Sequence, residues 1–441
     1  MKASNYNFFF PYEEDTSKLI AYNSRSNALG LIEKDKHNML VEFCENGVDI
    51  EDDQLIASLR KGLFLLDDDV NELDLIRFNM LNSRYSTTSL SFTIATTSDC
   101  NFRCSYCYEK DVIKPKYMSI ETEDKIIDLL KSKASSISAF NTTWYGGEPL
   151  MGFHTIERLS KAFIAICEEN KIEYSANMVT NGYFLTRDKV EKFEEFKISM
   201  LQVTLDGMAE MHDRRRPLAN GEPTFNVIMN NLKENIDILP HVSLRINVDK
   251  NNLESGKNIL DYLKEHKMEH RVVPYLGKIS NDNNCYTSSE CLTMYEFSKE
   301  DFNHHLSLQN EVDILNSYPS LASCFCGADS MSSFIIGAEG TLYKCWCDIG
   351  DEERSFGNIN DNQGVANKAL LDYMMYDPTN SGSCSKCKLL PVCMGGCPFR
   401  RLANNNDKCS IYKFMLENYL TVITKRLKNS PVRPQHQPSA V

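Results

Sequence analysis

The sequence predicts an α/β fold built around a partial (β/α)6 barrel, with a small unit before it and a cysteine-rich segment after it. From residue 90, short apolar runs alternate with amphipathic helical patterns. Residues 1–85 instead show three strand-like runs and then two helical patterns. Most of the 16 cysteines lie in two stretches, 100–107 and 324–409. The length of 441 residues is enough for two or three domains with buried cores.

Six strands and five helices make up the predicted barrel. The strands are Leu90–Thr96, Thr142–Tyr145, Ser175–Val179, Met200–Leu205, Val242–Val248 and Arg271–Tyr275. The helices are Ile120–Lys131, Thr155–Glu169, Arg187–Phe196, Thr224–Ile236 and Leu253–His266. Strands that alternate with helices indicate a parallel sheet with right-handed crossovers. Six such units form an incomplete barrel, and ligands are expected at the carboxyl ends of its strands.

The remaining segments complete the predicted domain plan of 1–85, 86–280, 281–320, 321–428 and 429–441. In the first, strands are expected at Tyr6–Phe10, Lys18–Tyr22, Ala28–Ile32 and Gly62–Leu66, and helices at His37–Asn46 and Asp52–Lys61. The bridging region 281–320 contains a helical pattern at Met294–His305, and Ile411–Lys428 forms a helix after the cysteines. The polar, Pro-rich tail 429–441 is expected to be disordered.

Composition excludes several functional classes. The formal net charge is −13, which argues against nucleic acid as a partner, because phosphate binding needs a basic surface. No apolar run approaches the roughly 20 residues that span a bilayer, and the start of the chain does not read as an export signal. A cytoplasmic location is therefore expected. In a reducing compartment, tight Cys-x2-Cys spacings favour metal or iron–sulfur ligation over disulfides.

The first cysteine motif, Cys100, Cys104 and Cys107, follows the first barrel strand. Three thiolates can hold three irons of a [4Fe–4S] cluster and leave the fourth iron open to a small molecule. A zinc site would need a fourth Cys or His nearby, and none lies between residues 90 and 120. The C-x3-C-x2-C spacing resembles that of the radical S-adenosylmethionine (SAM) superfamily. This resemblance implies that SAM chelates the open iron and is cleaved to a 5′-deoxyadenosyl radical, with Tyr106 beside the adenine.

Other candidate SAM contacts follow the later strands. Gly146, Gly147 and Glu148 come after the second strand, where a carboxylate can accept hydrogen bonds from an ammonium group. By the resemblance, this segment binds the SAM amino group, either through Glu148 or through the neighbouring backbone. Residues at the third, fourth and fifth strands are candidates for ribose and carboxylate contacts, although each could be an ordinary loop cap or a solvated charge. They are Thr180, Asn181, Thr204, Asp206, Arg214 or Arg216, and Arg245.

The second group of cysteines has a distinctive spacing that includes Gly340. It resembles the SPASM domain of radical SAM enzymes, which holds two auxiliary [4Fe–4S] clusters. By this resemblance one cluster takes Cys384, Cys387, Cys393 and Cys409. The other takes Cys326, Cys345 and Cys397, and its fourth ligand is Cys324, Cys347 or an open site. A zinc ribbon at residues 384–397 is the alternative, but it would leave Gly340 and the upstream cysteines unexplained.

These resemblances imply an enzyme that modifies peptides. The order of elements in residues 1–85 resembles the winged-helix precursor-recognition domain of ribosomal-peptide maturases, which would bind a leader peptide, for example by strand addition. The expected reaction is a thioether or other intramolecular cross-link, with a flavodoxin- or ferredoxin-type electron donor. Formylglycine formation by an anaerobic sulfatase-maturating enzyme is an alternative, but there an Asp follows the second SPASM cysteine, and here the residue is Trp346. An epimerase, and an electron carrier or redox sensor, also stay open.

Overall fold

The computed structural model describes residues 1–281, 286–308, 311–361, 367–403 and 406–429. The predicted disordered tail therefore lies, from residue 430 onward, outside the described residues. The chain divides into two compact units. The first unit contains Met1–Arg84, Met294–Cys326 and the chain from Tyr376 onward, and the second contains Tyr85–Thr293 and Gly327–Met375.

The second unit is built on a nine-stranded sheet in the order β11-β10-β9-β8-β7-β6-β12-β13-β14. Its first six members are parallel to their neighbours and are the six predicted strands, which the structure confirms. They are β6 (Ser89–Ala95), β7 (Ala139–Tyr145), β8 (Glu173–Thr180), β9 (Ile198–Leu205), β10 (His241–Val248) and β11 (Val272–Lys278). The α/β class with a mainly parallel sheet is therefore confirmed.

The two faces of this sheet differ in polarity because side chains alternate along each strand. One face is a buried apolar layer that includes Phe92, Trp144, Met178, Leu201 and Leu244. The residues between them are mostly polar and half-buried, and the register sets several opposite one another across neighbouring strands. These pairs include Asn141 with Ser175, Thr143 with Asn177, Gln202 with Ser243, Thr204 with Arg245, and Arg245 with Tyr275.

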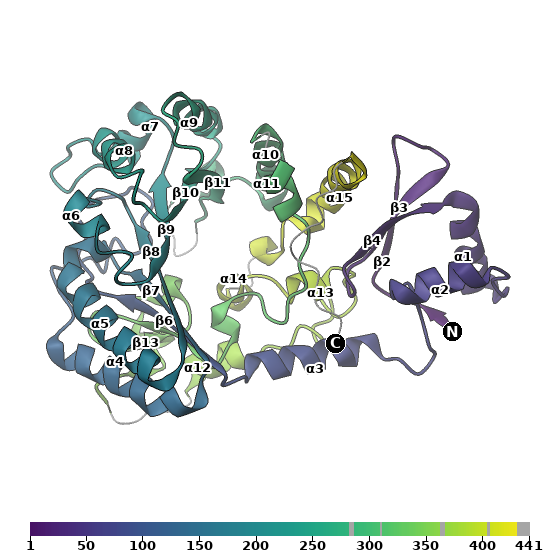
Figure 1. Ribbon diagram of the computed structural model, residues 1–441, viewed down its shortest axis with the longest axis horizontal. Helices are drawn as coiled ribbons and strands as arrows, with labels where there is room; N and C mark the ends of the chain where they lie inside the picture. Colours follow the sequence, from purple (N-terminus) through teal and green to yellow (C-terminus); the bar gives the residue numbers. More distant parts are fainter. Residues whose placement is uncertain (282–285, 309–310, 362–366, 404–405, 430–441) are drawn as a thin grey trace. The chain divides into compact units, whose positions relative to one another are not determined.

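Helices connect the parallel strands. They are α4 (Ile120–Lys133), α5 (Phe153–Asn170), α6 (Arg187–Val190), α7 (Ala209–Arg215), α8 (Phe225–Glu234) and α9 (Leu253–Glu265), and α4 and α5 lie side by side along the sheet (Figure 1). Ser119 caps α4 by accepting a hydrogen bond from the Thr122 amide at 3.2 Å. The predicted helix Arg187–Phe196 is shorter than expected and ends at Val190, because the amides of Lys192 and Phe193 donate to carbonyls only three residues earlier. The short helix α7 has no counterpart among the predicted helices.

Three further strands extend the sheet beyond β6. They are β12 (Ser333–Ile336), β13 (Thr341–Tyr343) and β14 (Gly357–Asn358), and α12 (Lys368–Met374) follows them. β12 pairs in parallel with β6, from Ser333 opposite Ser91 to Ile336 opposite Ile94. This pairing places residues 327–375 in the second unit, so the predicted segment 321–428 is divided between the two units.

After a two-residue strand at its start, the first unit has the predicted order of three strands and two helices, which the structure confirms. The elements are β1 (Lys2–Ala3), β2 (Asn7–Pro11), β3 (Lys18–Asn23), β4 (Ala28–Glu33), α1 (Lys34–Asn46), α2 (Asp53–Lys61), β5 (Leu65–Leu66) and α3 (Glu72–Arg84). β2, β3 and β4 form an antiparallel sheet, and β5 pairs with β1. The winged-helix resemblance of this segment stays a prediction.

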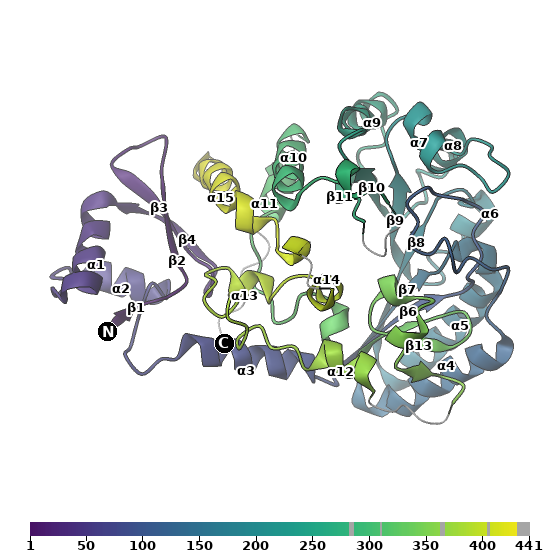
Figure 2. The same cartoon turned by 180° about the vertical axis from the view of Figure 1, so that it is seen from behind.

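The front residues share a core with the C-terminal part of the chain. The later elements of the first unit are α10 (Met294–Ser307), α11 (Glu311–Asn316), α13 (Leu390–Cys393), α14 (Pro398–Leu402) and α15 (Tyr412–Asn429), and α10 and α15 lie side by side (Figures 1 and 2). Tyr12, Ile20 and Tyr22 pack with Leu389 and Leu416 in one buried cluster. Residues 1–84 are therefore part of a larger unit, because one face of their sheet is covered by the C-terminal segment. No helix within the described ranges is long and apolar enough to cross a membrane.

Candidate functional site

The first cysteine motif lies in the long loop that follows β6 in the second unit. Two other segments hold this loop through backbone hydrogen bonds. On one side, the amides of Arg103 and Ser105 donate to the carbonyls of Pro217 and Arg215, at 2.9 and 3.0 Å. On the other, Thr97 pairs with Tyr117 in an antiparallel bridge. The loop is therefore built as a fixed part of the unit.

Cys100, Cys104 and Cys107 carry free, half-buried thiols on this loop. Burial raises the pKa of the Cys107 thiol to about 12, and it also raises the pKa values of Cys100 and Cys104. Cys104 and Cys107 add to the shift at Cys100, so the three sulfurs lie within electrostatic range of one another. A bound cation would offset the cost of three thiolates here.

No three His, Cys, Asp or Glu side chains in the described ranges gather around a single metal-ion position. An iron–sulfur cluster has a different requirement, since each cysteine binds a different iron and the sulfurs stay apart. Three thiols on one anchored loop fit that requirement. When bound, a [4Fe–4S] cluster here would supply the electron that cleaves SAM.

Gly146 and Gly147 pack directly against the cysteine loop. A Cβ atom at Gly146 would lie 2.3 Å from the carbonyl oxygen of Thr97, and one at Gly147 would lie 2.2 Å from that of Asp99. Gly146 also has a φ of +119°, which favours glycine. The Gly147 and Glu148 amides donate to the carbonyls of Thr97 and Asp99, at 3.2 and 3.0 Å. These glycines are needed because two backbone segments meet with no room for a side chain.

The Glu148 carboxylate is completely buried and accepts three hydrogen bonds from the protein. The donors are the Leu150 amide at 3.1 Å, the Thr180 hydroxyl at 2.7 Å and the Asn181 amide at 2.7 Å. Burial raises the pKa of Glu148, and these hydrogen bonds act in the opposite direction. Glu148, Thr180 and Asn181 are thus brought together as a junction between the ends of β7 and β8. Their predicted contact with SAM stays a prediction.

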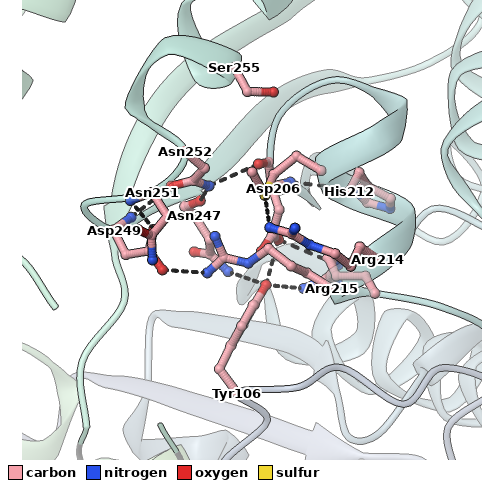
Figure 3. Close-up of polar contacts among 12 residues, drawn as sticks. Tyr106, Asp206, His212, Arg214, Arg215, Asn247, Asp249, Asn251, Asn252 and Ser255 are labelled. Atoms are coloured by element: carbon pink, nitrogen blue, oxygen red, sulfur yellow. Dashed lines mark hydrogen bonds and ion pairs between the residues drawn. The ribbon is translucent and has the colours of Figure 1, made fainter. Parts of the chain in front are cut away.

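Tyr106 is the centre of a polar network at the carboxyl ends of β9 and β10 (Figure 3). Its hydroxyl donates to Asp206 at 2.5 Å and accepts from Arg216 at 2.9 Å and from Asn247 at 3.0 Å. Burial raises the pKa of Tyr106 well above its usual value. The network therefore fixes the tyrosine of the cysteine motif to two strand ends of the sheet.

Two buried carboxylates and two arginines surround this tyrosine. Arg215 forms ion pairs with Asp206 and with Asp249, both at 3.0 Å, and Arg216 lies 3.9 Å from Asp206. Asn252 donates to the carbonyl of Asp206 at 2.8 Å. Sequence reasoning missed the roles of Arg215 and Asp249. The signal in the sequence was an arginine that follows soon after a carboxylate at a strand end, and this signal could have pointed to Arg215.

The other predicted SAM contacts, Arg214, Thr204 and Arg245, differ in how far they are buried. Arg214 is exposed and donates to the sulfur of Met211 at 3.3 Å, outside the ion pairs formed by Arg215 and Arg216. Thr204 is buried on β9 opposite Arg245 on β10. Arg245 donates from Nε to Asn247 at 2.7 Å, so it adjoins the network without reaching Tyr106. The roles of these three residues toward SAM stay predictions.

The four cysteines predicted for one auxiliary cluster lie together in the first unit. Burial raises the pKa of Cys393, and Cys409, Cys387 and Cys384 add to this shift, so their sulfurs are close to it. The turn after Cys393 consists of three consecutive residues with positive φ, Met394, Gly395 and Gly396. A Cβ at Gly396 would lie 1.8 Å from the carbonyl oxygen of Lys408, so only glycine lets residues 393–397 approach the chain before Cys409.

The ligands predicted for the other cluster are distributed over both units. Cys324, Cys326 and Cys397 belong to the first unit, and Cys345 and Cys347 to the second, so this ligand set stays a prediction. In the second unit, Cys345 and Cys347 interact with each other, and this contact is the largest cause of the raised pKa of Cys345.

Tyr145 connects Cys345 and Cys347 with the first motif. Burial raises its pKa, and Cys347, Cys107 and Cys345 raise it further, which places Tyr145 within electrostatic range of all three. The ring of Trp346 stacks on Tyr145 with centroids 5.6 Å apart.

Comparisons with known proteins agree with this geometry. Residues 94–263, which contain the cysteine loop, the two glycines and most of the Tyr106 network, match the radical SAM superfamily. These residues therefore form a radical SAM domain. A domain of this superfamily makes the chain an enzyme, and it implies a [4Fe–4S] cluster and SAM as cofactors.

Several radical SAM relatives resemble most of the chain. A cysteine-type anaerobic sulfatase-maturating enzyme from Clostridium novyi is 24% identical over 392 residues, 79% of this chain and 100% of the relative. The radical SAM cyclopropyl synthase TigE from Paramaledivibacter caminithermalis is 19% identical and covers 74% of this chain and 73% of its own length.

Solved structures of radical SAM enzymes share the fold. The structure of anSMEcpe with bound AdoMet has a TM-score of 0.61 at 18% identity, over 76% of this chain and 99% of its own. The Streptococcus suis SuiB structure bound to the precursor peptide SuiA has a TM-score of 0.54 at 13% identity, over 93% of this chain and 99% of its own. These relatives are SPASM-type enzymes, and the number of auxiliary clusters in this chain stays a prediction.

Proposed function

We propose that this radical SAM enzyme modifies a ribosomally made precursor peptide and forms a thioether or other intramolecular cross-link in it. The observation that carries the proposal is the extent of the likeness to SuiB, which was solved with a precursor peptide. That likeness covers 93% of this chain, against 76% for the sulfatase-maturating structure. The larger share supports a role for the front residues that a peptide maturase would need.

The chain supplies three features for this chemistry. The anchored loop with Cys100, Cys104 and Cys107 would hold the SAM-binding cluster, and Tyr106 would lie beside SAM. Polar residues cover one face of the sheet next to this loop, and such a face can hydrogen-bond a peptide backbone. In the first unit, Cys384, Cys387, Cys393 and Cys409 would hold an auxiliary cluster.

Forming the proposed thioether removes two hydrogen atoms from the peptide. The C–H and S–H bonds of the peptide break and a C–S bond forms. The hydrogen atom from carbon goes to the 5′-deoxyadenosyl radical, and the thiol proton goes to solvent. An auxiliary cluster, which Cys384, Cys387, Cys393 and Cys409 would hold, would accept the electron that remains, and a flavodoxin- or ferredoxin-type donor would supply the electron that cleaves SAM.

Formylglycine formation is the second candidate, because the whole length of the Clostridium novyi sulfatase-maturating enzyme matches this chain. That reaction needs a base close to the substrate. The carboxylate nearest to Trp346 in the sequence, Asp348, is buried and accepts a hydrogen bond from Tyr373 at 2.7 Å. Burial raises the pKa of Asp348 to about 6. A carboxylate enclosed in this way supports the cross-link over the formylglycine reaction.

Mass spectrometry tests the proposal. The reconstituted full-length enzyme is incubated with SAM, a reductant and peptides encoded by short reading frames beside its gene. A cross-linked peptide loses two hydrogens per event and does not react with a hydrazide. Formylglycine from serine loses the same mass but reacts with the hydrazide, and an epimerised residue instead takes up deuterium from solvent. Unmodified peptides with ongoing SAM cleavage would contradict a peptide-modifying role.

A further inference from the structure

Arg245 occupies a unique place in the sheet of the second unit. Between the first and last residues of the six parallel strands β6–β11, it is the only residue with a formal charge. Its neighbours across the sheet are Thr204 on β9 and Tyr275 on β11. A cation among neutral polar groups in the middle of a sheet needs an explanation, because strands normally exclude charge from such positions.

The guanidinium of Arg245 is half-buried and lacks an anionic partner. Its Nε donates to Asn247 at 2.7 Å, and its Cζ lies 6.0 Å from the centre of the Tyr275 ring. No carboxylate in the described part of the chain lies within ion-pair distance of it. The nearby Arg215, by contrast, is paired with two buried carboxylates. A partly buried charge without a counterion is unfavourable, and an anionic ligand would remove this cost.

The neighbouring residues hold this guanidinium in place. A Cβ at Gly277 would lie 2.5 Å from Nε and 2.6 Å from Cζ of Arg245, so the guanidinium lies directly on the backbone of β11. The hydroxyl of Tyr275 is held by Gln202 at 2.7 Å. The planar group is therefore positioned by its neighbours, which suits recognition of a carboxylate through two parallel hydrogen bonds.

Arg245 lies close to the Tyr106 network. Asn247, which accepts from Arg245, donates to the hydroxyl of Tyr106 at 3.0 Å. Two residues along a strand correspond to about 7 Å. On the other side, Arg245 lies within electrostatic range of Tyr145, which adjoins Cys107. A carboxylate on Arg245 would thus lie near Tyr106 and Tyr145, the residues that adjoin the first cysteine motif.

We propose that Arg245 binds a carboxylate of the substrate peptide, from an Asp or Glu side chain or from the C-terminus, and so selects acidic substrates. The proposal rests on the peptide-modifying function above. The methionyl carboxylate of SAM has the same chemistry, so the test must separate the two sources.

The test uses pairs of synthetic Cys- and Ser-containing peptides that differ only by Asp or Asn at one position. The two peptides of each pair compete for the full-length reconstituted enzyme in one reaction, and mass spectrometry of the products gives the ratio of their kcat/KM values. The wild-type enzyme should prefer the Asp member by about ten- to hundredfold, the range of a charged hydrogen bond. Arg245→Gln should abolish this preference, and Arg245→Glu should transfer it to a peptide with Lys at the same position.

Two further variants keep the test specific. Gly277→Ala, whose new methyl group displaces the guanidinium, should reduce the preference without changing any charge. Arg271→Gln removes an exposed charge at the beginning of the same edge of the sheet and should leave the preference intact.

Three outcomes would overturn the inference. They are the absence of an Asp preference in the wild type, a preference that survives in Arg245→Gln, and a loss of SAM affinity in Arg245→Gln, which would assign the carboxylate to SAM. If neutral and acidic peptides are modified equally, only this inference fails. If the wild type modifies no peptide, the proposed function fails with it.

Discussion

Gly147→Ala tests whether the contact between the Gly146–Gly147 segment and the cysteine loop is what positions the cluster ligands. The added Cβ would lie 2.2 Å from the carbonyl oxygen of Asp99 and 3.1 Å from the Cβ of Cys100. A normal carbon–oxygen contact is about 1 Å longer, and both neighbours belong to backbone or to its first side-chain atom, so the loop itself must move. Overpacking of this kind typically costs about 1–3 kcal/mol.

The assay measures two quantities. Iron analysis after anaerobic reconstitution should show a loss of about four irons per chain, the content of one [4Fe–4S] cluster, because the displaced loop no longer presents its three thiols. The melting temperature before reconstitution should fall by about 2–4 °C for each kcal/mol lost. Gly30→Ala is the matched control, because a Cβ there meets nothing within 4 Å. Full iron content and normal SAM cleavage in Gly147→Ala would refute the argument.

Three other changes have defined outcomes. Glu148→Gln should reduce the free energy of unfolding by about 1–3 kcal/mol and so lower the melting temperature, because an amide cannot accept all three hydrogen bonds of the buried carboxylate. An unchanged melting temperature would show that these hydrogen bonds do not stabilise the fold. Tyr106→Phe should keep the iron content but weaken SAM binding, measured by equilibrium dialysis, because Arg216 and Asn247 lose their acceptor. Burial raises the pKa of Asp301, so its contribution to stability is present at low pH and is lost as the pH rises through that raised value. The melting temperature of Asp301→Asn should therefore decline less between pH 4 and pH 8 than that of the wild type. An equal decline in the two proteins would contradict a raised pKa at Asp301.

The sequence alone determined the class of chemistry and most of the second unit. The spacing of Cys100, Cys104 and Cys107 is local, so this cysteine motif can be recognised without a structure. The six parallel strands were also predictable, because the apolar runs are bounded by loops and amphipathic helical patterns separate each run from the next. Local patterns of this kind depend on neighbours in sequence, which a single sequence displays.

The contacts between distant segments could not be predicted in the same way. Glu148 carries a plausible motif for an ammonium partner, yet its oxygens accept from Leu150, Thr180 and Asn181. Arg214 and its two neighbours look alike in the sequence, and only the fold decides which two of the three are buried against Asp206. In both cases the outcome depends on which strand ends meet, and spacing along the chain does not contain that information.

The grouping of the chain into two units was likewise decided by tertiary structure. Residues 1–84 have the pattern of a separate domain, but Tyr12 and Tyr22 are buried against Leu389 and Leu416. The segment from Ser333 to Ile336 follows the bridging region, yet it joins the parallel sheet beside β6. A sequence pattern shows that an element has an apolar face. Which distant element covers that face is decided only when the chain folds, because burial of apolar surface is not directional and many partners of similar polarity compete for it.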